Sequence, residues 1–263
     1  MREAQQQLLF PRPQRGVKAL LAVYGVVGLV AAILYNYVPS VGRQIFLWLA
    51  CFPGQVLRHA WTLVTAGLLA DPEHWSTWLF ALVGIYFLAP DLERRWGTWR
   101  LLRFVAISTV AGFALTLAVG AVTPHEARYF HPSMMYGSAA TLAALAVAWG
   151  RENAAQQIRL YMVLPISGRA LVWITLAFCA LGLFFPASVT EGVVSPFGGF
   201  IAGILLSGSP SPLRALWLRF KLAILRRGPA SRARVVRRAG SPSLRVVTGG
   251  IDDEPPKDKR YLN

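Results

Sequence analysis

The side chain best placed for chemistry is the hydroxyl of Ser138, near the start of the apolar segment Met135–Gly150, "MYGSAATLAALAVAWG". A serine hydroxyl becomes a good nucleophile only when a neighbouring base takes its proton, and histidine is the usual base. The sequence has four histidines, none of them inside an apolar segment, and His131 on the preceding loop is the best candidate. The alternative is structural, because a serine in a membrane helix commonly bonds a carbonyl of its own or a neighbouring helix.

The apolar segments that must position these residues are typical of a membrane protein. The chain is 55% hydrophobic and 15% charged, with a mean hydropathy of +0.45, which is unusual for a soluble domain of 263 residues. Crossing a bilayer takes about 20 apolar residues. Six segments approach that length: Lys18–Val38, Trp75–Pro90, Arg100–Val122, Met135–Gly150, Arg169–Phe185 and Val193–Ser207. The sequence therefore predicts an all-α membrane protein built as a bundle of six transmembrane helices.

Basic residues near the predicted spans indicate the orientation, because Lys and Arg gather on the cytoplasmic side of a membrane. They are frequent before the first span and after the second and fourth spans, and rare in the opposite connections. We therefore expect both termini to be cytoplasmic, and we expect a multi-pass protein of a bacterial plasma membrane from the compact six-span layout. The first outer connection, residues 39–74, is apolar but broken by Pro53 and Gly54. We expect it to dip into the membrane interface as short helices.

Composition divides the chain into three predicted regions. A cytoplasmic N-terminal segment, residues 1–17, precedes the membrane domain, residues 18–207, and a basic cytoplasmic tail, residues 208–263, follows it. The tail has thirteen basic and four acidic residues among Ser, Pro and Gly, so we expect it to be largely disordered. A basic tail can bind nucleic acid, but beside a membrane it is attracted to anionic lipid headgroups. The predicted partners are therefore the lipid bilayer and anionic headgroups, and no nucleic acid.

Two apolar segments have faces made of small residues. Gly199 and Gly203 leave one face of the stretch "SPFGGFIAG" almost bare, and Ala139 and Ala143 give a similar face to the segment that contains Ser138. Small residues allow two helix backbones in a membrane to approach closely. We therefore predict that these two helices pack against each other.

Several separated stretches resemble the rhomboid family of six-span intramembrane serine proteases. They are "WTLVTAGLLADPEHW", "FLAPDLERRWGTWRLL", "YGSAAT", "LYMVLPISGRALVW" and "SPFGGFIAGILLSG", in the family's order over residues 56–208. The resemblance implies a rhomboid-like fold with Ser138 at the nucleophile position. The residues Glu93, Arg94, Arg95 and Gly97 match a structural motif of the family at the inner end of the second span.

Other positions of the rhomboid active site are substituted in this sequence. The histidine of the sixth span is replaced by Pro196, and the histidine and asparagine that hold the oxyanion are replaced by Thr77 and Ala81. In a serine protease, loss of the base alone costs on the order of a millionfold in rate. The resemblance therefore implies a pseudoprotease that binds transmembrane helices of client proteins without cleaving them. The alternative is an active serine endopeptidase that uses Ser138 with a non-standard base such as His131. The sequence predicts no cofactor, and the spacing of its His, Cys, Asp and Glu residues predicts no metal site.

Overall fold

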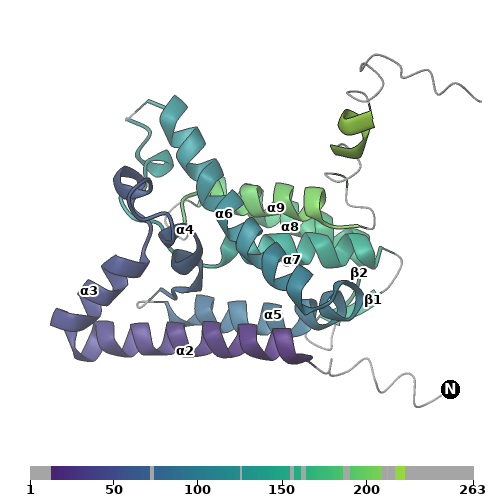
Figure 1. Ribbon diagram of the computed structural model, residues 1–263, viewed down its shortest axis with the longest axis horizontal. Helices are drawn as coiled ribbons and strands as arrows, with labels where there is room; N and C mark the ends of the chain where they lie inside the picture. Colours follow the sequence, from purple (N-terminus) through teal and green to yellow (C-terminus); the bar gives the residue numbers. More distant parts are fainter. Residues whose placement is uncertain are drawn as a thin grey trace, which may run out of the picture. The chain divides into compact units, whose positions relative to one another are not determined.

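The computed structural model describes residues 13–71, 74–124, 126–154, 157–160, 164–185, 190–208, 212 and 217–222. The long helices are α2 (Arg15–Tyr37), α5 (Trp75–Trp96), α6 (Thr98–Val122), α7 (Ala139–Glu152), α8 (Gly168–Phe184) and α9 (Ser195–Leu206) (Figure 1). These elements belong to the first of two compact units, Met1–Arg219; in the second, Phe220–Asn263, residues 220–222 are helical. The predicted disordered tail lies mostly outside the described residues.

The apolar segments form helices, so the predicted helical class is confirmed. Each of the six segments contains one long helix. Among the described helices, α2 and α6 are long and apolar enough to cross a membrane, whereas α8 and α9 are apolar but shorter. The 12 residues of α9 rise about 18 Å, against about 30 Å of hydrocarbon. The number of transmembrane spans, six, therefore stays a prediction.

The first outer connection forms short helices, as predicted. Helix α3 (Pro39–Leu49) is followed by the 3-10 helix η1 (Pro53–Gln55), by α4 (Thr62–Thr65) and by the 3-10 helix η2 (Ala66–Leu68). A proline begins both α3 and η1, because its missing N–H has no partner in a first helical turn anyway. The depth of this connection in a membrane stays a prediction.

One element departs from the all-α prediction. Strands β1 (Gln157–Leu160) and β2 (Leu164–Ser167) form an antiparallel pair between α7 and α8, with Gln157 opposite Ser167. Pro165 disfavours a helix there because it has no N–H to donate. Ser167 then caps the N-terminus of α8, since its Oγ accepts a hydrogen bond from the N–H of Ala170 at 3.2 Å.

Helices α5 and α7 differ most from the predicted spans. Helix α5 continues past Pro90 to Trp96, because the residues around the proline are buried and neighbouring contacts compensate for one missing hydrogen bond. It ends at Gly97, whose φ of +82° suits glycine. Helix α7 begins at Ala139, later than predicted, because Met135 pairs with Cys51 in a β-bridge.

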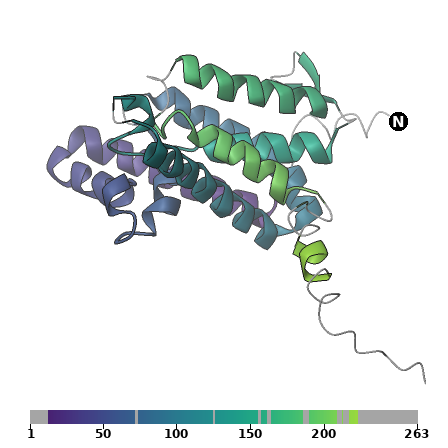
Figure 2. The same cartoon turned by 90° about the horizontal axis from the view of Figure 1, so that it is seen from above.

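Helix α7 is central, because it packs against α5, α6, α8 and α9. Helix α2 packs against α3, α5 and α6, and Figures 1 and 2 place it on the opposite side of the bundle from α8 and α9. Contacts between distant residues show that successive helices alternate in direction, which gives the bundle two ends. The Glu93 end contains the start of α2, the end of α5 and the end of α7. The Ser138 end contains the loop before η3 (Arg128–Phe130) and the start of α7.

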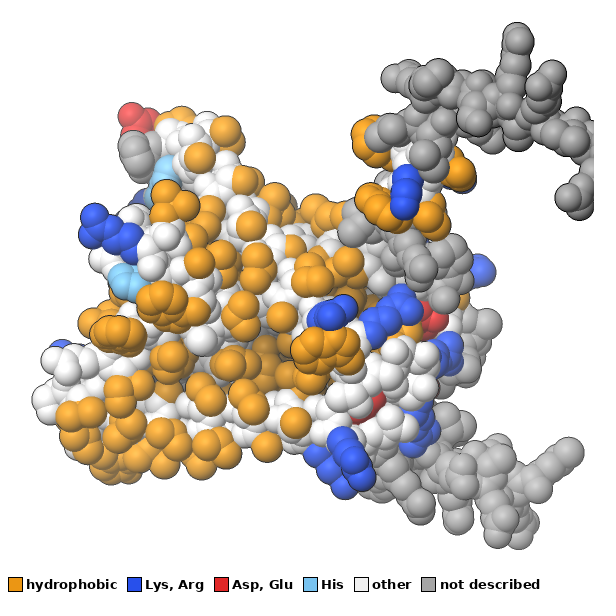
Figure 3. All heavy atoms as spheres, viewed as in Figure 1, with side chains coloured by type: hydrophobic (Ala, Val, Ile, Leu, Met, Phe, Trp, Pro, Cys, Tyr) orange, Lys and Arg blue, Asp and Glu red, His pale blue; other side chains and the backbone are white. Residues whose placement is uncertain are grey.

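Apolar side chains cover much of the surface as well as the core, and Figure 3 shows them over most of the visible face. Helix α2 alone exposes Val23, Val26, Leu29, Val30 and Ile33, each by more than two fifths. A large contiguous apolar surface is unfavourable in water and is suited to lipid. In the same view, Lys and Arg side chains gather toward the end where α2 begins.

Candidate site at the start of helix α7

A buried carboxylate lies on the N-terminus of α7. Glu191, in the turn before α9, is 2% exposed. Its Oε2 accepts hydrogen bonds from the backbone N–H of Ala140 at 3.0 Å and from the hydroxyl of Ser195 at 2.9 Å, and its Oε1 accepts one from the N–H of Ala139. The first N–H groups of a helix have no partner within the helix, and they attract anions. Glu191 therefore caps α7 from another part of the fold.

Gly137 and Gly192 allow the carboxylate of Glu191 to reach the start of α7. Gly137 has a φ of +127°, and a Cβ there would lie 2.7 Å from Oε1 of Glu191. Gly192 has a φ of +86°, and its Cβ would lie 2.6 Å from Cγ2 of Thr116 on α6. Both conformations are easy for glycine and strained for other residues. The chain can therefore turn tightly enough to bring residue 191 into the bundle.

Burial raises the pKa of Glu191, which lies in the connection between α8 and α9, because an ionised carboxylate is less stable away from water. The hydrogen bonds from Ala140, Ala139 and Ser195 act in the opposite direction, since they stabilise the ionised form. The net direction is upward. Glu191 thus holds a proton to a higher pH than an exposed glutamate does.

Ser138 is the N-cap residue of α7, but its side chain makes no capping hydrogen bond. Glu191 takes that role instead. Ser138 is half-buried. The Nε2 of His131, the predicted alternative base, lies 3.2 Å from Oγ1 of Thr123 and 3.1 Å from the carbonyl oxygens of Thr123 and Pro124. These contacts hold the His131 ring at the C-terminal end of α6.

The other described histidines, His59 and His74, contact Trp61 and Asp71. The ring of His59 is 4.8 Å from the ring of Trp61, measured between centroids. The Nδ1 of His74 lies 2.9 Å from Oδ2 of Asp71. His125 lies outside the described residues.

Helix α9 packs with its glycine face on α7. A Cβ at Gly199 would overlap the carbonyl oxygen of Ala140, and a Cβ at Gly203 would lie 2.9 Å from the carbonyl oxygen of Ala144. The two backbones therefore approach as closely as glycine allows. The facing residues, Ala140 and Ala144, each follow one of the predicted contact residues, Ala139 and Ala143.

Pro196, Thr77 and Ala81, which the rhomboid resemblance marks as substituted active-site positions, each have a structural role in this fold. Pro196 is buried in the first turn of α9, where its missing N–H leaves no helical hydrogen bond unmade. Thr77 is exposed near the start of α5, and its hydroxyl donates to the carbonyl of His74 at 2.7 Å. Ala81, one turn further along α5, is 1% exposed and therefore belongs to the core.

Glu93 caps a helix at the other end of the bundle. Its side chain is fully buried. Its Oε1 accepts hydrogen bonds from the N–H of Gly16 at 2.7 Å and from the hydroxyl of Thr98 at 2.6 Å, and its Oε2 accepts one from the N–H of Val17 at 2.9 Å. These N–H groups lie in the first turn of α2, so the carboxylate joins the end of α5 to the start of α2. Its neighbour Arg94 is exposed.

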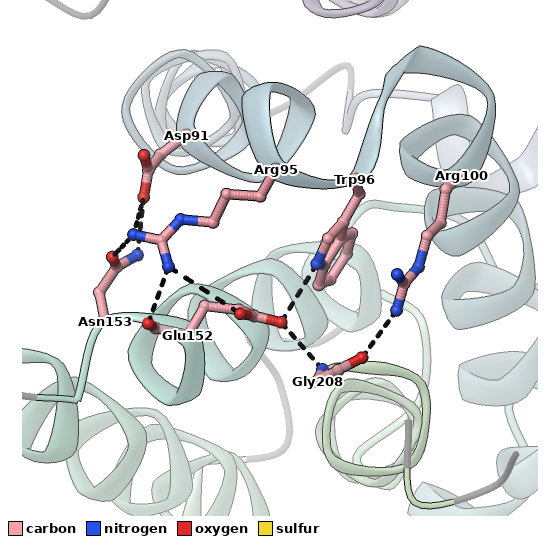
Figure 4. Close-up of polar contacts among 7 residues, drawn as sticks. All are labelled: Asp91, Arg95, Trp96, Arg100, Glu152, Asn153 and Gly208. Carbon is pink, nitrogen blue, oxygen red and sulfur yellow. Dashed lines mark hydrogen bonds and ion pairs between the residues drawn. The ribbon is translucent and has the colours of Figure 1, made fainter. Parts of the chain in front are cut away.

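Arg95 joins α5 to the end of α7 (Figure 4). Its Nη1 donates to the carbonyl oxygen of Glu152 at 3.0 Å, and its Nη2 donates to Oδ1 of Asn153. The side-chain amide of Asn153 donates in turn to Oδ2 of Asp91 at 2.7 Å. The last turns of α5 and α7 are thus held together by polar contacts.

The same group of contacts includes Gly208, the second residue after α9. The Oε1 of Glu152 accepts hydrogen bonds from the indole N–H of Trp96 at 3.1 Å and from the backbone N–H of Gly208 at 2.9 Å, and Arg100 donates to the carbonyl of Gly208 at 2.8 Å (Figure 4). The sequence analysis did not identify Glu152, Asn153 or Gly208. Polar residues are common at the ends of apolar segments, so their position alone does not indicate these contacts.

Comparison with known proteins identifies the class of this chain. Residues 18–207 match the family described as eukaryotic integral membrane protein, DUF1751. The match covers most of the chain, so the chain belongs to this family and is an integral membrane protein. No curated protein matches the sequence.

The family match corrects the resemblance drawn from the sequence. The interpretation as a rhomboid was wrong, because the matching family is a different one and no rhomboid match was found. Residue roles that rested on the resemblance, such as Ser138 as nucleophile position and Pro196 as the lost base, therefore lose that support. Short apolar motifs with Gly, Ala and Ser mislead easily, since close helix packing alone selects the same residue types. The expected bacterial plasma membrane has no support either, because the family is described as eukaryotic.

Proposed function

We propose that this integral membrane protein binds transmembrane helices of client proteins and does not cleave them. The observation that supports the proposal is that Ser138, Ala139 and Leu142 at the start of α7 are half-buried, while the N-terminus of the same helix is capped by Glu191. Accessibility favours binding of another helix there, and the cap opposes hydrolysis.

The cap opposes acyl transfer at Ser138 for an electrostatic reason. Hydrolysis needs N–H donors that stabilise the developing oxyanion, and removal of one such donor costs about 3 kcal/mol. The two N–H groups that follow Ser138 in the chain, those of Ala139 and Ala140, both donate to Glu191. An ionised Glu191 also repels a second negative charge. The alternative, a serine endopeptidase, would have to displace this carboxylate and recruit a base.

Helix α7 is least enclosed near its start. Ser138, Ala139 and Leu142 are half-buried, although Ala140 and Thr141 between them are buried, and the helix is buried from Ala143 to Gly150. Another helix can therefore reach α7 through Ser138, Ala139 and Leu142.

Helix α8 exposes apolar side chains toward its end. Leu171, Thr175 and Cys179 form its buried face, which is at most 8% exposed. One turn further, Leu183 is 44% exposed and Phe184 is 77% exposed. The end of α8 therefore offers apolar side chains to a partner in the membrane.

Helix α5 contacts α7 at Leu142. A Cβ at Gly84 would lie 2.7 Å from Cδ2 of Leu142, so α5 meets α7 at this pair. Phe80, one turn nearer the Ser138 end on the same face, is 58% exposed. In a bilayer, where helices associate by packing and not by escape from water, we expect an apolar client helix to pack on Phe80, Leu142 and Leu183.

Photo-cross-linking in membranes tests the binding. A benzophenone amino acid is placed at Leu183 or Phe80, with Val26 as a matched control because it is 61% exposed on α2. We expect cross-linked peptides from Leu183 and Phe80 to map to transmembrane segments of other proteins and to be absent from Val26. Equal adducts at all three positions, or adducts with lipid alone, would contradict the proposal.

A separate measurement tests the absence of cleavage. The purified protein is incubated with a fluorophosphonate probe and with a labile transmembrane substrate, beside the Ser138→Ala variant. We expect neither labelling nor cleavage in either protein. Labelling or cleavage by the wild type that disappears in Ser138→Ala would show that the protein is a serine hydrolase.

A further inference from the structure

A cavity of about 310 Å³ lies between α3 and the connection that follows it. Leu47 and Trp48 of α3 and Phe52, Gln55 and His59 of the connection line its walls. This volume is at the lower end of the range for small-molecule sites, about 300–1,000 Å³. None of the described lining residues is acidic. The cavity is therefore aromatic and apolar, with a few polar groups, and is separate from the start of α7.

Two of the lining residues, Trp48 and His59, form a cluster of three rings with Trp61, which does not itself line the cavity. The ring centroids of Trp48 and Trp61 are 6.3 Å apart with planes inclined by 27°, and the His59 ring lies 6.3 Å from Trp48 and 4.8 Å from Trp61. A cation is attracted to an aromatic face within about 6 Å of its centroid, and tryptophan is the strongest such partner. Because the two indole centroids are this close, one cation can lie within that distance of both.

The surroundings of the cluster are typical of a membrane interface. Trp48 is 70% exposed, Trp61 is 48% exposed and the nearby Leu57 is fully exposed. Tryptophan is enriched at the level of the lipid headgroups, where its ring is partly in apolar and partly in polar surroundings. A fully exposed leucine such as Leu57, which lies between Val56 and Arg58, is suited to insertion among lipid chains.

We propose that this cavity binds the quaternary ammonium headgroup of a choline phospholipid. Trp48 and Trp61 attract the trimethylammonium group, whose charge is spread over methyl groups and needs no acidic partner. Arg58 is exposed and next to His59 in the chain, so it provides a positive charge for the lipid phosphate. The cavity admits the headgroup and leaves the acyl chains beside Leu57. This site does not depend on the proposed binding of client helices.

Native mass spectrometry of the purified full-length chain tests the site. The protein is equilibrated with phosphatidylcholine, phosphatidylethanolamine or phosphatidylglycerol that carry the same acyl chains. From the usual strength of cation–π contacts, we expect phosphatidylcholine to be retained about fivefold or more over the other two. Equal retention of phosphatidylcholine and phosphatidylethanolamine would overturn the proposal, because both have a cationic headgroup and only one is quaternary.

Matched variants assign the effect to the aromatic cluster. Trp48→Ala should remove the preference, Trp48→Phe should restore part of it, and Trp173→Ala should leave it unchanged, because Trp173 on α8 is also 70% exposed. A preference that survives Trp48→Ala, or that is lost equally in Trp173→Ala, would overturn the proposal. A competition with soluble phosphocholine, added at the same concentration as the lipid, distinguishes a lipid ligand from a soluble choline compound. If phosphocholine displaces phosphatidylcholine, the site binds a soluble choline compound and the lipid proposal is contradicted. If phosphatidylcholine stays bound, the lipid proposal is supported.

Discussion

The Oε2 atom of Glu191 lies 3.0 Å from the backbone nitrogen of Ala140 and so joins the turn before α9 to the first turn of α7. The same relationship recurs between Glu93 and Val17 at 2.9 Å, where the end of α5 meets the start of α2. In both pairs a buried carboxylate from one element accepts hydrogen bonds from the first-turn N–H groups of a helix, which have no acceptor within that helix. These contacts position helices that apolar packing alone would leave free to slide.

Replacement of Glu191 should therefore destabilise the protein. Glu191→Ala leaves the N–H groups of Ala139, which is half-buried, and Ala140, which is buried, without an acceptor. We expect a loss of roughly 2–4 kcal/mol in the free energy of unfolding. Denaturant unfolding in detergent micelles measures the change. Glu126→Ala is the control, because Glu126 is an exposed acid in another loop. Equal losses in the two variants would show that Glu191 does not act as a cap.

The raised pKa of Glu191 predicts how stability depends on pH. Because the pKa in the folded protein lies above the ordinary value of 4.5, the folded state holds the proton more tightly than the unfolded chain. The resulting contribution to stability is complete below about pH 4.5 and is lost as the pH rises through the folded pKa. The free energy of unfolding, measured against Glu191→Gln across this range, should show this fall. A difference that instead grows with pH would mean that the three hydrogen bonds outweigh burial.

Gly199 and Gly25 should respond in opposite ways to the same substitution. Gly199→Ala places a methyl group on the carbonyl oxygen of Ala140, so we expect it to separate α7 from α9 and to cost about 1–3 kcal/mol or more. A methyl group at Gly25 meets nothing within 4 Å, so Gly25→Ala should stabilise α2 by up to about 1 kcal/mol. Thermal unfolding of the two variants in parallel checks this. An equal effect of both variants would contradict close packing of α9 on α7.

Glu93 should matter much more than its neighbour. Glu93→Ala removes an acceptor from Gly16, Val17 and Thr98, and we expect the N-terminal part of α2 to lose protection against hydrogen exchange. Arg94→Ala is the matched control, since Arg94 is adjacent and exposed. Hydrogen exchange of residues 15–20, followed by mass spectrometry, measures the difference. Unchanged protection in Glu93→Ala would show that the first turn of α2 is stable without the carboxylate.

Much of the fold could be predicted from apolar run length alone. Each of the six segments contains a long helix, because a run of this kind must satisfy its backbone internally in an apolar environment. Local patterns failed where tertiary contacts decide the structure. Met135 was expected in a helix, but Cys51 holds it extended through hydrogen bonds of 2.8 and 3.0 Å. No local feature of either segment indicates that pairing.

The candidate site was less predictable than the fold. The sequence points to Ser138 because a hydroxyl can act as a nucleophile, whereas nothing in the sequence assigns a role to Glu191, whose side chain caps the start of α7. A lone acid between two apolar segments was the available signal, because a carboxylate beside a membrane needs partners. Its partners are backbone N–H groups, which a sequence pattern cannot specify at long range.

Residues 135–137, which lead into α7, are bonded on both sides. Cys51 pairs with Met135, the N–H of Gly137 donates to the carbonyl of Ala66 at 3.0 Å, and the hydroxyl of Thr190 donates to the carbonyl of Tyr136 at 2.8 Å. Hydrogen bonds thus join three stretches that are far apart along the chain: the stretch after α3, the residues before α7 and the turn before α9. The stretch after α3 and the turn before α9 do not have to contact each other to be coupled, because both are hydrogen-bonded to the residues that lead into α7.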